Sequence, residues 1–207
     1  SRIIPEALLK ISNSVETIDD QIEADEYLLD ELLIRVKDEI DLEDDEEYKR
    51  ITIRINGNGI EIRDQLKGEK IGTKRQFLVS EGQLVLSKID ARSGAFGILP
   101  ADCDGAIITG NFWAYNINED IVEPEFLRLI ITSEKFLNFC KASSTGTTNR
   151  KYLDESKFLD QSIKIPEIGI QRKIVAIVRN VEEIHYNFLQ LSNVGIDLRH
   201  SIIDRIV

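Results

Sequence analysis

Polar side chains that could read hydrogen-bond donors and acceptors gather in one stretch of the chain, residues 83–113. The members of this set are Lys88, Asp90, Arg92, Ser93 and Asn111. They follow short apolar runs, and Gly94 and Gly97 let the backbone turn sharply beside them. Functional groups often lie at strand ends and turns of a rigid sheet, so this stretch predicts a recognition surface. The alternative left open is a pair of strands joined by a polar turn.

Patterns for catalysis are weak. The chain contains neither the phosphate-binding pattern G-x-x-x-x-G-K-[ST] nor a G-x-S-x-G elbow. His185 and His200 both fall in the C-terminal stretch without metal-ligand spacing. Carboxylates near a lysine, which a metal-dependent nuclease needs, occur at Glu61, Asp64, Glu69 and Lys70, with no specific spacing. We therefore expect a non-catalytic protein that binds no cofactor or metal itself.

The negative charge of the chain lies in its N-terminal quarter. Residues 1–50 hold 17 Asp and Glu against 6 Lys and Arg, which accounts for the whole net charge of −11. The remaining residues, 51–207, hold 20 of each sign. The stretch with Lys88 and Arg92 is therefore not electrostatically hostile to phosphate.

Cysteine usage and hydropathy indicate the setting. Cys103 and Cys140 lie far apart without a Cys-x-x-Cys pattern, which favours a reducing, cytoplasmic environment over a disulfide framework. No apolar run approaches the ~20 residues of a membrane helix. We expect no association with a membrane.

Two stretches have helical heptad spacing. The first comprises Ile11, Val15, Ile18, Ile22, Leu29, Leu32 and Val36, with Asp25 at the missing position. It predicts an acidic helical segment over residues 1–46 that ends in a charged linker. The second comprises Ile174, Ile177, Val181, Ile184, Phe188 and Leu191. It predicts a helix over residues 167–207 that pairs with the first seam or with a second molecule.

Residues 47–166 change to strand-like periodicity. Ile51, Ile53 and Ile55 alternate with polar residues before Asn56-Gly57-Asn58-Gly59, which predicts a hairpin. Further strands are expected at residues 77–79, 84–89, 96–99, 106–109, 112–117 and 162–165. Helices are expected from Pro124 and around residues 136–140, and residues 143–150 read as a polar loop. Strands followed by helices predict an α+β fold with Trp113 in the core.

Several segments in this order resemble the specificity subunit of type I restriction–modification enzymes. They are YKRITIRINGNGIEIRD, IGTKRQF, SKIDARSGAFGILP, DGAIITGNFW, SSTGTTNRKYL and SIKIPEIGIQRKIVAIV, which run from about Tyr48 to the C-terminus. The resemblance implies a globular α/β target recognition domain that reads half of a split DNA sequence. It also implies a conserved coiled-coil helix that begins at the junction from Pro166 to Gln171.

The resemblance also implies partners. Specificity subunits bind double-stranded DNA and dock the methyltransferase subunit, which carries S-adenosylmethionine, and the complex includes a restriction subunit. This chain departs from the family by containing one recognition domain and one helix instead of two of each. It therefore resembles half of a specificity subunit, either one that forms a homodimer or a fragment. A coiled-coil adaptor that binds no DNA is the alternative.

The residue types agree with DNA recognition. Lys and Arg can bind guanine or phosphate, Asn can pair with adenine, and Ser and Thr suit phosphate oxygens. The candidate DNA-binding residues are Lys74, Arg75, Lys88, Asp90, Arg92, Ser93, Asn111, Thr147, Thr148, Asn149 and Arg150. We expect residues 147–150 to position the DNA backbone and Lys88, Asp90 and Arg92 to lie near base edges. The alternative for each is a solvated or salt-bridged surface residue.

Overall fold

The computed structural model describes residues 22–147 and 150–206, with side chains up to residue 190 except at 147, 150 and 189. The strands are β1 (Ala24–Leu28), β2 (Leu33–Val36), β3 (Asp38–Asp41), β4 (Glu47–Ile53), β5 (Ile60–Lys67), β6 (Arg75–Val79), β7 (Leu84–Ser87), β8 (Phe96–Ile98), β9 (Ala106–Ile108), β10 (Phe112–Ile117), β11 (Ser144–Thr147), β12 (Arg150–Leu153) and β13 (Ser162–Pro166). The α-helices are α2 (Leu29–Leu32), α3 (Pro124–Ile131), α4 (Glu134–Ala142), α5 (Glu155–Leu159) and α6 (Ile168–Ile206), and the 3-10 helices are η2 (Gly68–Lys70), η3 (Ala91–Ser93) and η4 (Ala101–Cys103). The expected α+β fold is confirmed.

Two larger sheets, beside the two-stranded pairs β1-β13 and β11-β12, form the globular part of the chain. One has four antiparallel strands in the order β2-β10-β7-β8, and the other has five in the order β3-β6-β9-β4-β5. Leu84 and Leu86 pack into the main core under the helices, while Val85 between them packs toward the five-stranded sheet. Side chains alternate across a strand, so this pattern buries β7 on both faces.

The β4–β5 hairpin has the predicted turn, which docks on another loop. Asn56 has a φ of 61° and Gly57 a φ of 67°, the left-handed backbone that such turns need. The Asn56 amide donates to the Ser93 carbonyl at 2.7 Å and the Gly57 amide to the Gly94 carbonyl at 3.0 Å. Gly94 also has a φ of 81°, and a Cβ there would lie 2.9 Å from both amide nitrogens. Only glycine fits this contact.

A buried glutamine fixes the base of α6. Gln171 is fully buried, and its Nε2 donates to the carbonyls of Ile121 and Pro166, each at 2.8 Å. Its Oε1 accepts from the Glu123 amide at 2.8 Å. The side chain thus satisfies polar groups of two separate segments, which makes it costly to remove.

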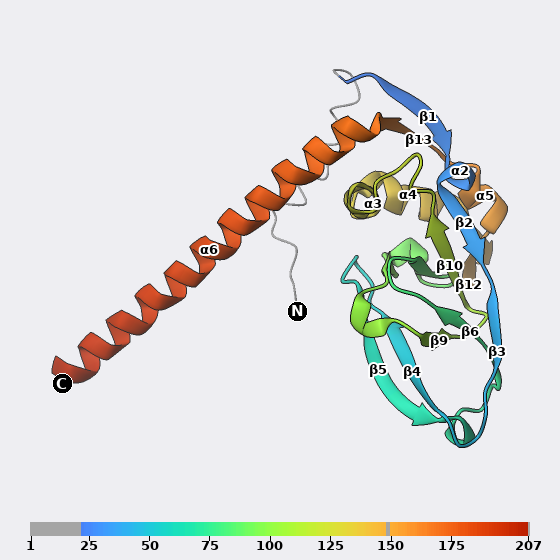
Figure 1. Cartoon of the computed structure of the whole chain (residues 1–207), viewed down its shortest axis with the longest axis horizontal. Helices are drawn as coiled ribbons and strands as arrows, with labels where there is room; N and C mark the ends of the chain where they lie inside the picture. Colours follow the sequence, from blue (N-terminus) through green and yellow to red (C-terminus); the bar gives the residue numbers. More distant parts are fainter. Residues whose placement is uncertain (1–21, 148–149, 207) are drawn as a thin grey trace.

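The first turns of α6 pack on the globular part, and the rest of the helix projects away from it (Figure 1). Val175 and Val178 are buried in the main core, and Ile174 packs against it. Arg128 of α3 lies 3.3 Å from Glu182. The seam member Ile174 is therefore used inside this chain and not for pairing with another helix. Among the described residues, no helix has the length and apolar character of a membrane span.

The predicted continuous N-terminal helix is wrong for residues 24–41, because only α2 is helical there and most of the rest forms β1, β2 and β3. The backbone of β1 pairs with β13, and β2 pairs with β10. Leu29, Leu32 and Leu33 are buried in the main core. Pairing with distant strands thus outweighs the local helical spacing. The globular part therefore begins before residue 47, and the seam positions Ile11, Val15 and Ile18 lie outside the described residues.

The polar stretch 143–150 also differs from its expected form. Its residues Ser144–Thr147 form β11, which pairs with β12, so that Thr147 lies opposite Arg150. The expected loop is thus a hairpin, and α5, which was not predicted, follows it. The remaining predicted strands and the helices at α3, α4 and α6 are confirmed, with ends that differ by a few residues.

Candidate nucleic-acid interface

Two cationic side chains lie against the ring of a buried tryptophan on the four-stranded sheet. Lys88 Nζ lies 5.1 Å from the centre of the Trp113 ring, and Arg35 Cζ lies 5.3 Å from it. Arg35 also lies 5.3 Å from the Tyr115 ring. Trp113 is 7% exposed, which confirms its place in the core. Its ring therefore forms a floor under the two cations, at the distance of a cation–π contact.

The local field is positive. Burial lowers the pKa of Lys88, and so do the charges of Arg35 and Lys37, while Glu155 opposes them. Burial also lowers the pKa of Arg35. We call Arg35, Lys37 and Lys88 the cation cluster. Their mutual repulsion means that the site favours an added anion.

Glu155 at the start of α5 is the carboxylate that faces the cluster. Its Oε1 lies 3.1 Å from Arg35 Nε and accepts from the Tyr115 hydroxyl at 2.9 Å. Burial, followed by the charge of Glu155, raises the pKa of Tyr115, which keeps this hydroxyl a donor. Arg35 Nε and Nη1 are buried and have no hydrogen-bond partner among the described residues. The Arg35–Glu155 contact is therefore an ion pair without hydrogen-bond geometry.

Six cations elsewhere on the globular part lie against carboxylates. The pairs are Arg50–Asp64, Arg54–Glu61, Arg63–Asp64, Lys74–Asp44, Arg75–Glu39 and Arg128–Glu125. By contrast, Lys49 Nζ donates to backbone carbonyls. The cluster differs because three cations face one carboxylate and two of them lie against one ring.

Two predicted site residues, Lys88 and Asn111, lie next to the cluster. The Lys88 amide donates to the Asn111 carbonyl at 2.9 Å, and the Lys88 carbonyl accepts from the Leu153 amide at 2.7 Å. The end of β7, the start of β10 and the end of β12 therefore meet at Lys88. This contact brings the β11–β12 hairpin, which includes Thr147 and Arg150, to the same edge. Thr148 and Asn149 at its tip lie outside the described residues.

The other residues of the predicted stretch lie on η3 beside β7. Asp90 and Ser93 are exposed, and Arg92 is half-buried. The Asp90 carbonyl accepts from the Ser93 amide at 2.8 Å, which closes this short helical turn. Arg92 forms no ion pair with a side chain in the described ranges. Its guanidinium and the Asp90 carboxylate are therefore available to a ligand.

Lys74 and Arg75 lie on or beside β6 in the other sheet. Lys74 Nζ donates to Asp44 at 2.5 Å and to the Gly68 carbonyl at 2.6 Å, and Arg75 pairs with Glu39. These contacts hold neighbouring strands and turns together. The structure therefore does not bring these two residues to the cation cluster.

Arg35, Lys37 and Glu155 were not predicted from the sequence. Side chains two residues apart lie on the same face of a strand, so an extended segment would have placed Arg35 and Lys37 together. The helical spacing of the neighbouring leucines concealed that signal. Nothing in the local sequence indicates that Glu155 faces Arg35.

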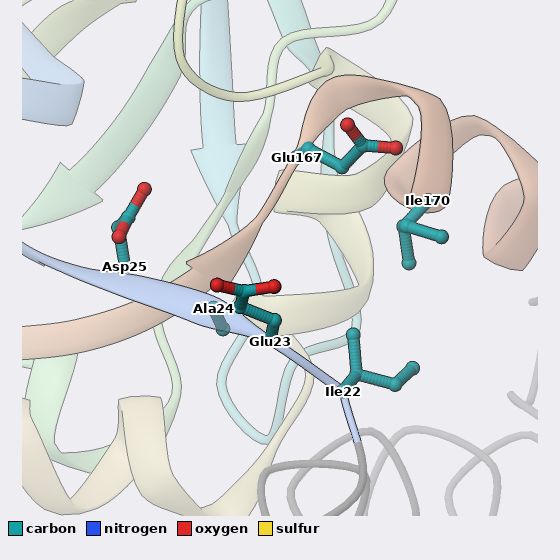
Figure 2. A pocket seen from close by; sticks show the side chains of 6 residues that line it. All are labelled: Ile22, Glu23, Ala24, Asp25, Glu167 and Ile170. Carbon is teal, nitrogen blue, oxygen red and sulfur yellow. The ribbon is translucent and has the colours of Figure 1, made fainter.

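A separate hollow of about 500 Å³ lies between β1 and the base of α6. Figure 2 shows that Glu23, Asp25 and Glu167 surround it, with Ile22 and Ile170 at one side. Its carboxylates make it unsuited to phosphate. Within the described ranges, no group of three His, Cys, Asp or Glu side chains has the arrangement of a metal site.

Comparison with known proteins agrees with this architecture. The chain is 27% identical over 108 residues to the Type I restriction enzyme HindI specificity subunit of Haemophilus influenzae, an alignment that covers 51% of this chain and 23% of that protein. The HsdS subunit from Thermoanaerobacter tengcongensis superimposes with a TM-score of 0.65 at 20% identity, covering 81% of this chain and 44% of that chain. The S subunit of a type I restriction–modification system from M. genitalium gives a TM-score of 0.52 at 14% identity, with coverage of 83% and 42%.

The chain thus spans less than half the length of each of these relatives. The family model described as the type I restriction modification DNA specificity domain matches residues 33–191. This range begins at β2, which carries Arg35, and ends within α6. Because it covers most of the chain, the protein belongs to the family of type I restriction–modification specificity domains.

Proposed function

We propose that this chain reads one half of a split DNA site for a type I restriction–modification system. The observation that carries the proposal is the cation cluster, in which three cations face one carboxylate and two of them lie against the same aromatic ring. Phosphate contacts supply most of the salt-dependent affinity of DNA-binding proteins. The η3 turn and the β11–β12 hairpin flank this cluster and supply the polar groups for base edges.

We assign the chemistry to other subunits. The chain would contribute recognition, while a methyltransferase subunit would bind S-adenosylmethionine and a restriction subunit would cut DNA. In this assignment the globular part, up to residue 166, contacts DNA and the helix from residue 167 contacts protein. Purified chain incubated with S-adenosylmethionine and duplex should therefore transfer no methyl group, and detectable transfer would refute the assignment.

The α6 helix offers a surface for pairing. Ile177, Ile184 and Phe188 are 61%, 69% and 68% exposed, which is unusual for large apolar side chains on one helix. Pairing of two copies would join two recognition domains and produce a symmetric reader of a palindromic split site. The side chain of Leu191, which continues this seam, is not described.

Charge placed in the seam tests the pairing. Ile184→Asp should convert a dimer to a monomer in light scattering, because a buried unpaired carboxylate costs several kcal/mol. Asn180→Asp is the matched control, since it adds the same charge at an exposed position on the same helix. An unchanged molar mass for Ile184→Asp would place the interface elsewhere.

Two measurements test DNA recognition itself. Duplex binding by the wild-type chain should weaken steeply as salt rises. Selection of methylated duplexes from a randomised pool, with the methyltransferase subunit present, should return one defined half-site. A protein partner that binds while duplex does not, at any salt concentration, would instead support the coiled-coil adaptor.

A further inference from the structure

We propose that Arg35 and Lys88, supported by Lys37, bind one backbone phosphate of DNA above the Trp113 ring. This inference rests on the proposed function, and it names the ligand group and residues that the general function does not specify. It also assigns a direct role to β2, a strand on which no candidate residue was predicted.

The Arg35 guanidinium is incompletely hydrogen-bonded. Its Nε and Nη1 are buried and have no hydrogen-bond partner among the described residues. Buried donors without an acceptor cost free energy, and an anion bound at the exposed part of the same guanidinium would offset that cost. Charge-assisted hydrogen bonds from a guanidinium to a phosphate oxygen are among the stronger hydrogen bonds.

Positive charges from two separate strands converge at this site. Arg35 lies on β2 and Lys88 follows β7, yet both approach one ring on β10 at 5.3 and 5.1 Å. Like charges held this close repel, and an anion between them would remove the repulsion. The Lys88 backbone is fixed by Asn111 and Leu153, so the site is already formed without a ligand.

The exposure of the ring indicates the kind of ligand. Because Trp113 is 7% exposed, its ring cannot stack on a nucleobase as an open aromatic platform would. Lys88 is half-buried and the Arg35 side chain is 21% exposed, so both cations are partly accessible. The site therefore suits a phosphate and not a base, and it would hold the DNA in register without reading sequence.

The chain carries its own reporter for this site. Trp113 is the single tryptophan of the 207 residues, so intrinsic fluorescence excited at the red edge of the indole band reports only on this position. A mixed-sequence duplex should change the emission with the same midpoint as binding measured by anisotropy. The double variant Arg35→Gln/Lys88→Gln should reduce the slope of log affinity against log salt by about 0.9, the contribution of one phosphate, and each single variant should reduce it by part of that amount.

The matched control is Arg54→Gln, which removes one positive charge from an arginine that pairs with Glu61 on the other sheet. It should leave the salt slope and the Trp113 signal of the complex unchanged. Circular dichroism and thermal melting of each variant establish that it is folded. If Arg35→Gln fails to fold, Arg35→Lys takes its place. This variant keeps the positive charge and loses the guanidinium, so it should retain the salt slope of duplex binding and weaken the affinity.

The outcomes separate the two levels of proposal. Salt-dependent duplex binding with unaltered slopes in folded Arg35→Gln and Lys88→Gln would overturn this inference and leave DNA recognition intact. No duplex binding by the wild-type chain would overturn both. A Trp113 response to inorganic phosphate or polyglutamate, but none to duplex, would also overturn the inference, since the site would then serve another anion.

Discussion

In the five-stranded sheet arginines lie opposite carboxylates on neighbouring strands, whereas in the four-stranded sheet Arg35 lies opposite Tyr115. Arg50 faces Asp64 across β4 and β5, and two hydrogen bonds of 2.6 and 2.7 Å join them. Arg35 shares its carboxylate, Glu155, with a tyrosine hydroxyl and leaves two nitrogens unsatisfied. One sheet thus neutralises its arginines, and the other brings Arg35 and Lys88 together at one ring.

This difference separates stability from binding. Opposite charges across a strand pair contribute modestly to the stability of a sheet. Repelling cations over a buried ring reduce stability, and they persist in proteins mainly where a ligand uses them. Removal of a positive charge should therefore reduce stability in the five-stranded sheet and reduce DNA affinity in the four-stranded sheet.

The largest expected effect is on DNA affinity. Reversal of both cluster charges in Arg35→Glu/Lys88→Glu should weaken duplex binding by about 100-fold or more, because like charges at an interface cost several kcal/mol. The swap Arg54→Glu/Glu61→Arg preserves net charge on the other sheet and should bind as the wild type does. Anisotropy titration at fixed salt distinguishes them, and equal affinities would remove the contrast between the sheets.

A smaller effect is expected on stability from Arg50. Arg50→Ala should lower the free energy of unfolding in urea by about 1 kcal/mol at neutral pH, since it breaks a bidentate ion pair. Hydrogen bonding from Arg50 lowers the pKa of Asp64, so this stabilisation is present above the ordinary pKa of 3.8 and is lost as pH falls through the folded value. The difference between wild type and variant should shrink in acid. A constant difference would show that the pair acts through packing.

Removal of a cluster cation should have a still smaller effect on stability. Arg35→Met keeps contact with the rings and eliminates two unsatisfied buried donors. These effects oppose each other, so we expect the free energy of unfolding to remain within about 1 kcal/mol of the wild type. Urea titration and duplex-binding measurements on the same variant check this, because the DNA affinity should fall while the free energy of unfolding should not. A marked loss of stability would make Arg35 a structural residue.

The smallest effect is expected for Arg75, which pairs with Glu39 on the exposed edge of the five-stranded sheet. Arg75→Ala should leave both the urea midpoint and the salt slope of duplex binding unchanged, because exposed ion pairs contribute little. A reduced salt slope would extend the DNA-binding surface to β6, as the sequence analysis expected, and would weaken the division between the two sheets.

Local periodicity was sufficient to predict much of the fold. The Asn56-Gly57 turn and the apolar runs of β7 and β10 require only neighbouring residues, so the hairpin and central strands were predicted correctly. The continuous helix predicted over residues 24–41 was wrong outside α2, because leucines with helical spacing can equally be buried in a core built from a short helix and strands. The pairing of β1 with β13 joins residues far apart in the chain, and no local pattern contains it.

The candidate site divides in the same way. Lys88 and Asn111 follow strands that could be recognised, and they do lie together. Arg35 and Glu155 belong to segments whose structure was assigned wrongly or not predicted. Their approach to Trp113 depends on the order of strands in the sheet, which single-sequence patterns do not specify.

The three hydrogen bonds of Gln171 have a consequence for the far end of α6. The helix has 39 residues, which gives a length of about 58 Å. At that length a tilt of about 3.4° at the base moves the tip by about 3.4 Å, the rise of one base pair. The buried Gln171 amide, together with Val175 and Val178, therefore limits the angular freedom of the arm. Under the proposed function, that freedom would limit the number of base pairs between two half-sites.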